Sequence, residues 1–300
     1  MTKPFKVLIL GYGEMGHAMQ FLLGQRCPLN IWEKWPKPGF RSVVLSEAAS
    51  QADIVIFCLP VNPHREVIEQ IAPLLKKKCI CVSIAKGLDE AGQTAAQIFA
   101  DVLGGQQPYA LMYGPMISEE ICAAHSAFAQ VGCSEVTTYK TISELFFGTR
   151  LYLEYTPDIT GISWAVILKN VYALAFGMAD ELQLGDNMRG YLSVSALSEL
   201  GQIVGYMGGQ AGSVYHLAGL GDLITTATSE DSHHHQLGRM LVRGDTENIE
   251  GEGIHTLEMV NQHQLFKESD YPLFKLIHDI VREPREVQEQ FYTYLKNSYR

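Results

Sequence analysis

The segment at residues 6–18 reads KVLILGYGEMGHA. It opens with a short apolar run typical of a buried strand, and Gly11, Gly13 and Gly16 follow in the pattern Gly-x-Gly-x-x-Gly. In such a pattern the first glycine permits a tight turn, the second lets a pyrophosphate approach the backbone, and the third allows a helix to pack closely on the strand. The helix that follows turns its free N–H groups and the positive end of its dipole toward the anion. The segment therefore predicts a dinucleotide-binding turn that needs no basic patch.

An acidic residue ends the second predicted strand, 22 positions after Gly11. In a dinucleotide-binding fold, Glu33 at this place accepts hydrogen bonds from the adenosine ribose, and the alternative is a solvated loop acid. Lys34 comes next and could instead meet the 2′-phosphate of NADP, but the neighbouring carboxylate would repel that phosphate. We therefore expect NAD, with NADP as the alternative. The motif is also compatible with a methyltransferase, but the lysine-centred helical second half argues against one.

Strand-like and helix-like runs alternate through the first half of the chain. The predicted strands are 6–10, 29–32, 53–59, 79–84, 110–113 and 128–131. The predicted helices between them are 17–23, 65–75, 93–103 and 142–147. Strand–helix alternation with apolar strands is typical of a parallel sheet covered on both faces. A last strand is expected within 151–158.

After residue 158 the strand pattern stops and helix-length segments follow. The predicted helices are 159–181, 188–207, 233–242, 255–263, 272–281 and 286–297. We therefore predict the α/β class, with a Rossmann-type doubly wound parallel sheet domain at 1–155 and an all-helical substrate and catalytic domain at 156–300.

Charge is distributed unevenly along the chain. The composition, with 47% hydrophobic and 19% charged residues, is that of a globular protein and excludes disordered and fibrous classes. The net charge of −10 argues against a nucleic-acid partner. Residues 1–150 hold 13 basic and 13 acidic side chains, whereas residues 151–300 hold 10 and 20. Between positions 151 and 238 the only lysine or arginine residues are Lys169 and Arg189, so each of them needs an explanation.

Cysteine usage and apolar runs indicate a cytoplasmic protein. All six cysteines lie in the first 133 residues, mostly in apolar runs where they act as small hydrophobes, and Cys79 and Cys81 should share one sheet face, so we expect no disulfide or metal there. The apolar run before the glycine turn is too short for a secretory signal. The stretch 159–178 is long enough to span a bilayer, but Lys169 and Asn170 at its middle favour a buried helix instead of a membrane span.

Two lysines stand in apolar surroundings. Lys86 follows the fourth predicted strand, at the edge where open α/β sheets place their ligands. Lys169 lies in the most apolar predicted helix, and burial disfavours a charged amine, which suits a lysine to acid–base catalysis near neutral pH. The alternatives are a loop cation for Lys86 and a surface lysine with a buried stem for Lys169. Asp222 follows a glycine-rich stretch and, taken alone, is equally suited to cap a helix.

Together these segments resemble the NAD(P)-dependent glycerol-3-phosphate dehydrogenases over about residues 5–295. The matching motifs occur in the family's order and read GYGEMGHA (11–18), SIAKGL (83–88), MYGPMISEEI (112–121, with Glu120 as its final acid), DITGISWAVILKNVYALAFGMADELQLGDN (158–187), LAGLGDLITTATS (217–229) and EGEGIHT (250–256). The resemblance implies hydride transfer between a nicotinamide and C2 of dihydroxyacetone phosphate, within glycerol-3-phosphate metabolism and the supply of phospholipid precursors.

The resemblance also implies a role for each matching residue. Lys169 would supply or accept the proton on the C2 oxygen, and Lys86 would orient and polarise the substrate. Asn170, Asp222 and Thr226 would hold the substrate and set the charge of Lys169. The cofactor would carry the redox chemistry while these groups position the substrate and handle the proton.

One departure from the family concerns the substrate phosphate. The family places an arginine–asparagine pair after its threonine-rich segment, and the matching positions here are His233 and His234. A second basic position of the family is Ser195 here. Arginine is a bidentate and permanently charged phosphate ligand, whereas histidine loses its charge near pH 6.5. Glu230 and Asp231 beside the run make phosphate binding less favourable still.

Three interpretations of this histidine run stay open. Partly protonated histidines would hold the phosphate, with weaker binding above pH 7. The substrate would instead lack a phosphate and be another small hydroxy or keto compound. Or the run is a solvated or incidental metal-binding loop, and Arg189 or another cation binds the phosphate. Three adjacent histidines do not share a helix face, which argues against a dedicated metal site.

The leading prediction is a dehydrogenase with a small-molecule substrate, and a catalytically silent NAD-binding regulator is the alternative from another class. The long apolar helices are compatible with a homodimer. The predicted site residues are, for catalysis, Lys169, Lys86, Asp222, Asn170 and Thr226; for the cofactor, Gly11, Tyr12, Gly13, Glu14, Met15, Gly16, Glu33, Lys34, Pro60, Lys86 and Glu252; for the substrate, Lys86, Gly114, Lys169, His233 and His234; and none for a metal.

Overall fold

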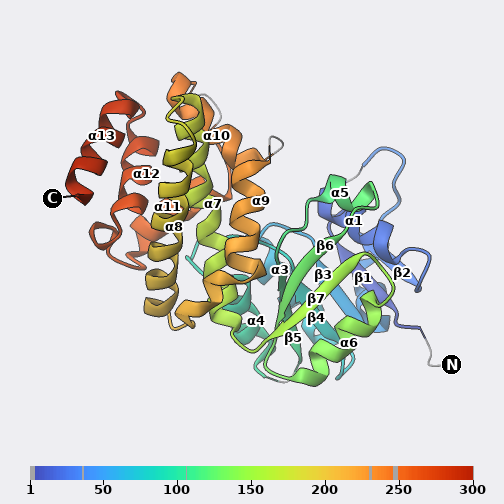
Figure 1. Ribbon diagram of the computed structural model, residues 1–300. Coiled ribbons are helices and arrows are strands. Elements are labelled where there is room, and N and C mark those ends of the chain that lie inside the picture. The colour runs from blue at the N-terminus through green and yellow to red at the C-terminus, as the bar shows by residue number, and fades with distance from the viewer. Residues whose placement is uncertain (1–3, 36, 106, 230–231, 246–248, 300) are drawn as a thin grey trace. The chain divides into compact units, whose positions relative to one another are not determined.

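The computed structural model describes residues 4–35, 37–105, 107–229, 232–245 and 249–299, and Figure 1 shows its course. The chain forms two compact units, one running to Asp89 and continuing over Gln93–Ile159, the other made of Glu90–Gly92 and the chain from Thr160 onward. Glu230 and Asp231, the two acids beside the histidine run, lie outside the described residues.

The first unit is built on a seven-stranded sheet with the order β2-β1-β3-β4-β5-β6-β7. Its strands are β1 (Val7–Leu10), β2 (Leu29–Trp32), β3 (Ile54–Phe57), β4 (Ile80–Ser83), β5 (Tyr109–Tyr113), β6 (Ala127–Gly132) and β7 (Leu151–Thr156). Neighbouring strands pair in parallel except β5 and β6, which are antiparallel. The doubly wound sheet is confirmed, and the one reversal is a difference from the all-parallel expectation.

Helices cover both faces of this sheet. One core cluster packs α1 (Glu14–Leu23), α5 (Ser118–Cys122) and α6 (Val136–Phe146) on the sheet. The other cluster holds α2 (Leu45–Gln51), α3 (His64–Ile71) and α4 (Ala95–Leu103). Cys79 and Cys81 are buried together in this second cluster, so their common face is confirmed. The short helices α2 and α5 were not predicted, because neither is long enough to show a clear helical period.

The second unit is helical throughout its described residues. Its helices are α7 (Ile159–Glu181), α8 (Asp186–Tyr206), α9 (Asp222–Thr228), α10 (His233–Arg243), α11 (Glu252–His263), α12 (Pro272–Arg282) and α13 (Val287–Ser298), with the short turns η2 (Ala211–Tyr215), η3 (Leu217–Gly221) and η4 (Glu268–Asp270). Residues 161–179 of α7 are all buried, so this apolar helix packs like a protein core helix and not like a membrane span. The prediction of a buried central helix is therefore confirmed.

A buried carboxylate fixes α7 and α8 to the start of α12. Glu199 Oε1 accepts the N–H of Leu273 at 2.6 Å, and its Oε2 accepts the N–H of Phe274 and the hydroxyl of Tyr172, both at 2.9 Å. Burial raises the pKa of Glu199 against the effect of these three donors. Because Tyr172 is three residues from Lys169 on α7, this anchor restrains the turn of helix that carries the lysine.

Candidate functional site

The glycine turn takes the conformation that its pattern predicts. Gly11 has φ 95°, a left-handed backbone that favours glycine, and a Cβ on Gly16 would lie 2.2 Å from the carbonyl oxygen of Gly11. A Cβ on Gly13 would have no atom within 4 Å, so space is open in front of the turn. The N-cap of α1 is Gly13, with no side-chain cap, which leaves the first N–H groups of the helix available to an anion. These features fit a dinucleotide pyrophosphate.

Glu33 lies against this turn and is ionised at neutral pH. Its carboxylate accepts the Tyr12 N–H at 2.8 Å and the Trp35 N–H at 3.3 Å, and Lys37 pairs with it at 3.5 Å. Burial opposes ionisation, but these donors and the lysine outweigh it and hold the pKa of Glu33 below its usual value. Lys34, the alternative 2′-phosphate ligand, instead pairs with Glu66 at 3.1 Å.

Lys86 lies at the carboxyl edge of the sheet, beside a second predicted residue. Its ammonium donates to the Gly114 carbonyl, which follows β5, at 3.4 Å. The backbone before Lys86 is held by the Tyr113 hydroxyl, which donates to the Ala85 carbonyl at 2.8 Å. Pro60 lies in the loop that follows β3, three residues after the last residue of that strand. The first unit thus gathers its predicted residues at the ends of β1 to β5, the place where such sheets bind ligands.

In the second unit, Lys169 is held in a buried polar cluster. Its ammonium donates to Thr226 Oγ1 at 2.5 Å and lies 3.2 Å from Asp222 Oδ2. The three residues are 4%, 8% and 3% exposed, for Lys169, Thr226 and Asp222 respectively. The Thr226 hydroxyl donates to the Asp222 carbonyl at 2.7 Å, so its lone pairs face the lysine. A buried ammonium with a fixed counter-charge is suited to give a proton to a ligand oxygen.

A single π-helical turn, η3, directly precedes Asp222. Such turns are rare and often occur at functional sites. It leads into α9, where Asp222 and Thr226 are one helical turn apart and so face Lys169 together. The sequence left open a helix-capping role for Asp222, but Asp222 is the first residue of α9, whose N-cap is Gly221.

Asn170 extends the cluster toward the start of α11. Its amide nitrogen donates to Glu252 Oε2 at 3.1 Å. Asn170 is 1% exposed, and its Oδ1 has no hydrogen-bond partner within the described part of the chain. A buried acceptor without a partner is costly, and a ligand hydroxyl would relieve that cost.

His233 and His234 both contact the segment that begins α11. His233 Nε2 bonds to the Glu250 carbonyl at 2.8 Å, and His234 Nε2 accepts the Gly253 N–H at 3.2 Å. An imidazole nitrogen that accepts a hydrogen bond carries no proton, so His234 is neutral in this arrangement. His233 and His234 therefore contact the residues on either side of Glu252, the residue to which Asn170 is hydrogen-bonded.

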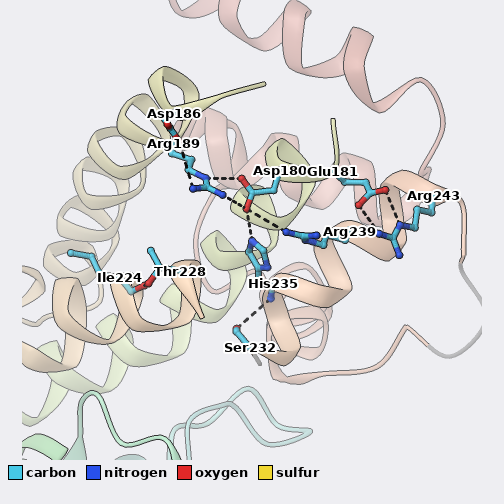
Figure 2. A network of polar contacts seen from close by, with 10 residues as sticks. All are labelled: Asp180, Glu181, Asp186, Arg189, Ile224, Thr228, Ser232, His235, Arg239 and Arg243. Carbon is cyan, nitrogen blue, oxygen red and sulfur yellow. Dashed lines mark hydrogen bonds and ion pairs between the residues drawn. The ribbon is translucent and has the colours of Figure 1, made fainter. Parts of the chain in front are cut away.

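The third histidine belongs to a separate polar network, shown in Figure 2. His235 Nε2 lies 2.7 Å from Asp180 Oδ2, and Arg189 donates to both Asp180 oxygens at 2.7 and 2.8 Å. α7 and α10 can approach this closely because each carries a glycine at the contact. A Cβ on Gly177 would lie 2.0 Å from the His235 carbonyl oxygen, and a Cβ on Gly238 would lie 2.2 Å from the Leu174 carbonyl oxygen. Arg189 is therefore engaged by Asp180. Within the ranges that the structure describes, no three His, Cys, Asp or Glu side chains form a metal-binding group.

Sequence reasoning missed two polar residues near the predicted cofactor positions. Lys37 hydrogen-bonds the Tyr12 carbonyl as well as pairing with Glu33. His64 is fully buried between the ends of β3 and β4. Its position directly after Pro63, at the start of a helix that follows an apolar strand, was the one available signal.

Comparison with known proteins gives matches along most of the chain. The family model of the NAD-dependent glycerol-3-phosphate dehydrogenase N-terminus matches residues 41–138, and the model of the C-terminus matches residues 158–292. The glycerol-3-phosphate dehydrogenase [NAD(P)+] of Mycobacterium avium is 31% identical over 268 residues, covering 81% of this chain and 78% of the relative. That of Nitratidesulfovibrio vulgaris strain DP4 is 27% identical over 324 residues, covering 96% and 98%.

Solved structures show the same fold. The crystal structure of glycerol-3-phosphate dehydrogenase from Coxiella burnetii has a TM-score of 0.83 at 24% identity, covering 97% of this chain and 99% of that one. The enzyme from Plasmodium falciparum has a TM-score of 0.82 at 17% identity, covering 97% and 95%.

Proposed function

This chain belongs to the NAD-dependent glycerol-3-phosphate dehydrogenase family, and we propose that it moves a hydride between NAD(P)H and C2 of dihydroxyacetone phosphate, forming sn-glycerol 3-phosphate in the reducing direction. It is an NAD(P)-dependent dehydrogenase. The observation that carries the proposal is the buried cluster of Lys169, Asp222 and Thr226, because reduction of a ketone needs a positioned proton donor at its oxygen.

The residues at the sheet edge bind and orient the cofactor in this proposal. The N–H groups at the start of α1 hold the pyrophosphate, with Gly11, Gly13 and Gly16 giving it access, and Glu33 holds the adenosine ribose. When bound, the nicotinamide supplies and accepts the hydride. Tyr12, Glu14 and Met15 form the rest of the turn. The contacts of Lys34, Pro60 and Glu252 with the cofactor are part of the same proposal.

The second unit handles the proton. Asp222 lies beside the Lys169 ammonium as its counter-charge, and Thr226 fixes the direction of that ammonium, so the lysine is placed to protonate the C2 oxygen during hydride transfer. In the reverse direction Lys169 takes that proton back. Asn170 Oδ1 accepts a substrate hydroxyl, and Lys86 and Gly114 contribute to substrate binding from the sheet edge.

The phosphate of the substrate requires a cation, and we propose that His233 supplies it. His234 is neutral while its Nε2 accepts the Gly253 N–H. The Nε2 of His233 instead faces the Glu250 carbonyl, which only accepts, so this nitrogen carries a hydrogen and the His233 ring is compatible with a positive charge.

A substrate screen tests the proposed function. NADH oxidation should proceed with dihydroxyacetone phosphate and be at least about tenfold less efficient with unphosphorylated dihydroxyacetone, since a charged hydrogen bond contributes about 1.5–3 kcal/mol. His233→Gln should raise the KM for the phosphate ester several-fold at pH 7 and change the KM for unphosphorylated dihydroxyacetone less than twofold. Equal efficiency with both ketones would show that the substrate needs no phosphate, and no turnover with any ketone would favour a silent NAD-binding protein.

Glu33 should make NADH the better cofactor. Its ionised carboxylate repels a 2′-phosphate, so kcat/KM should be about tenfold or more higher with NADH than with NADPH. Glu33→Gln should narrow this ratio mainly by improving the use of NADPH. Glu69→Gln, at an exposed carboxylate of α3 that pairs with Arg65 at 3.4 Å, is the matched control and should change the ratio less than twofold. A wild-type preference for NADPH would contradict this role of Glu33.

We also propose that the protein is cytoplasmic and forms a homodimer. The six cysteines are free thiols, which suits a reducing compartment. Val194 and Tyr206 on α8 are 70% and 66% exposed, and such apolar side chains are suited to a subunit contact. Light scattering of the purified protein would give the oligomeric state.

A further inference from the structure

His64 is a buried histidine that has no role in the proposed function. It is the first residue of α3 and is completely inaccessible to solvent. Its ring packs against two aromatic rings that also contact each other, with centroid distances of 5.0 Å to Phe57 and 5.8 Å to Phe99. An imidazole buried among aromatic rings could be replaced by an apolar side chain if packing were its only task.

Both ring nitrogens are hydrogen-bonded, and they bond to different loops. Nδ1 lies 2.8 Å from the Pro60 carbonyl in the loop after β3, and Nε2 lies 2.9 Å from the Ser83 hydroxyl at the end of β4. A carbonyl only accepts, so Nδ1 carries the hydrogen, and the neutral ring then accepts the Ser83 hydroxyl proton at Nε2. Burial lowers the pKa of His64 to about 4, against the effect of the hydrogen bond to Pro60, so the ring is neutral throughout pH 6–8.

Ser83 passes this connection on to the backbone that leads to Lys86. Its hydroxyl oxygen accepts the Ala85 N–H at 3.2 Å, and the Tyr113 hydroxyl holds the Ala85 carbonyl on the other side of the same residue. The peptide units on both sides of Ala85 are thus restrained, one of them through Ser83 and His64. Lys86 is the next residue, and its ammonium reaches Gly114.

We propose that His64 is a positioning residue that joins the Pro60 loop to the Lys86 loop through Ser83 and so fixes where Lys86 meets the substrate. The proposal rests on the proposed function in that Lys86 is taken as a substrate ligand. Loss of the link would leave Lys86 present but mobile. Because a displacement of about 1 Å can cost about 100-fold in rate, a loss of at least about tenfold in kcat/KM is expected.

The test is an epistasis measurement with dihydroxyacetone phosphate and NADH. His64→Phe keeps an aromatic ring against Phe57 and Phe99 but removes both hydrogen bonds, and Lys86→Met removes the group that His64 is inferred to position. His64→Phe should lower kcat/KM about tenfold in the wild-type background and less than twofold in the Lys86→Met background. His64→Gln, which keeps one donor and one acceptor, should recover part of the loss. An equal loss in both backgrounds would mean that His64 acts on stability alone and would overturn the proposal.

A second readout is independent of turnover. Labelling of Lys86 by an amine-reactive reagent, followed by mass spectrometry of the folded protein, should be at least about threefold faster in His64→Phe and in Ser83→Ala. Labelling of Lys140, on the distant helix α6 of the same unit, should not change. If the wild-type protein failed to turn over dihydroxyacetone phosphate, the proposed function would be wrong and the labelling rate alone would decide the role of His64. Unchanged labelling of Lys86 would overturn that role.

Discussion

Lys169→Met should lower kcat for ketone reduction by about 1,000-fold or more while leaving NADH binding within about threefold of the wild type. A positioned general acid contributes about 10²–10⁴ in rate, and Lys169 also supplies the positive charge beside the developing alkoxide. Thr226 and Asp222 fix the position of the Lys169 ammonium. A water molecule could take over its role only by making the same two contacts. Stopped-flow measurement of NADH oxidation gives the rate, and quenching of protein fluorescence gives cofactor affinity.

Stability must be separated from chemistry in this experiment. Removal of Lys169 alone takes away the counter-charge of the buried Asp222 carboxylate, and breaking a buried ion pair in this way costs about 3–5 kcal/mol. The double variant Lys169→Met/Asp222→Leu replaces the buried pair by apolar side chains and should regain much of this loss, yet remain inactive. Lys296→Met, at an exposed lysine of α13, should match the wild type in both respects. Retained turnover in either variant that lacks Lys169 would contradict its role as the proton donor.

Much of this arrangement could be predicted from the sequence because short motifs determine it locally. The glycine pattern at 11–16 fixes a turn through backbone sterics alone, and it formed as predicted. The polar pair Lys169-Asn170 in the middle of an apolar stretch indicated a buried helix, and the structure confirms that helix. Asp222 and Thr226 are four residues apart, so once α9 forms they face one direction.

Other features depend on contacts between residues far apart in the sequence. Lys37 reaches Glu33 through the path of a loop, and His64 meets Ser83 only because β3 and β4 are neighbours in the sheet. β6 and β7 run opposite to β1–β5, and no pattern in their own residues predicts that direction. The charge deficit of the second half pointed to Arg189 as a spare cation, but the structure pairs it with Asp180. No local pattern encodes that pairing.

The pairing of Asp180 should account for a large part of the stability of the second unit. Asp180 is 9% exposed in its side chain and joins α7 to Arg189 on α8 and to His235 and Arg239 on α10 (Figure 2). Asp180→Asn keeps the shape but removes the charge and one acceptor. It should lower the free energy of unfolding by about 2–3 kcal/mol, measured by urea denaturation at pH 7, since its arginine partners are partly exposed.

Asp186→Ala is the matched control, because Asp186 pairs with the same Arg189 at 3.5 Å but is 96% exposed. Its loss should be below about 0.5 kcal/mol, as expected for a surface pair. An equal loss in both variants would show that burial of Asp180 adds nothing to the pair.

The pH dependence of the difference between wild type and Asp180→Asn gives an independent test. Burial raises the pKa of Asp180, but hydrogen bonds and charges from Arg189 and His235 outweigh it, so the pKa lies below its usual value. As the pH falls, the unfolded chain therefore binds the proton first. The stabilisation is fully present above about pH 4, the unfolded value, and is lost as the pH falls through the lower folded value. The gap between wild type and variant should accordingly narrow below about pH 4, and a constant gap from pH 7 to pH 3 would mean that the charge of Asp180 is not what stabilises the unit.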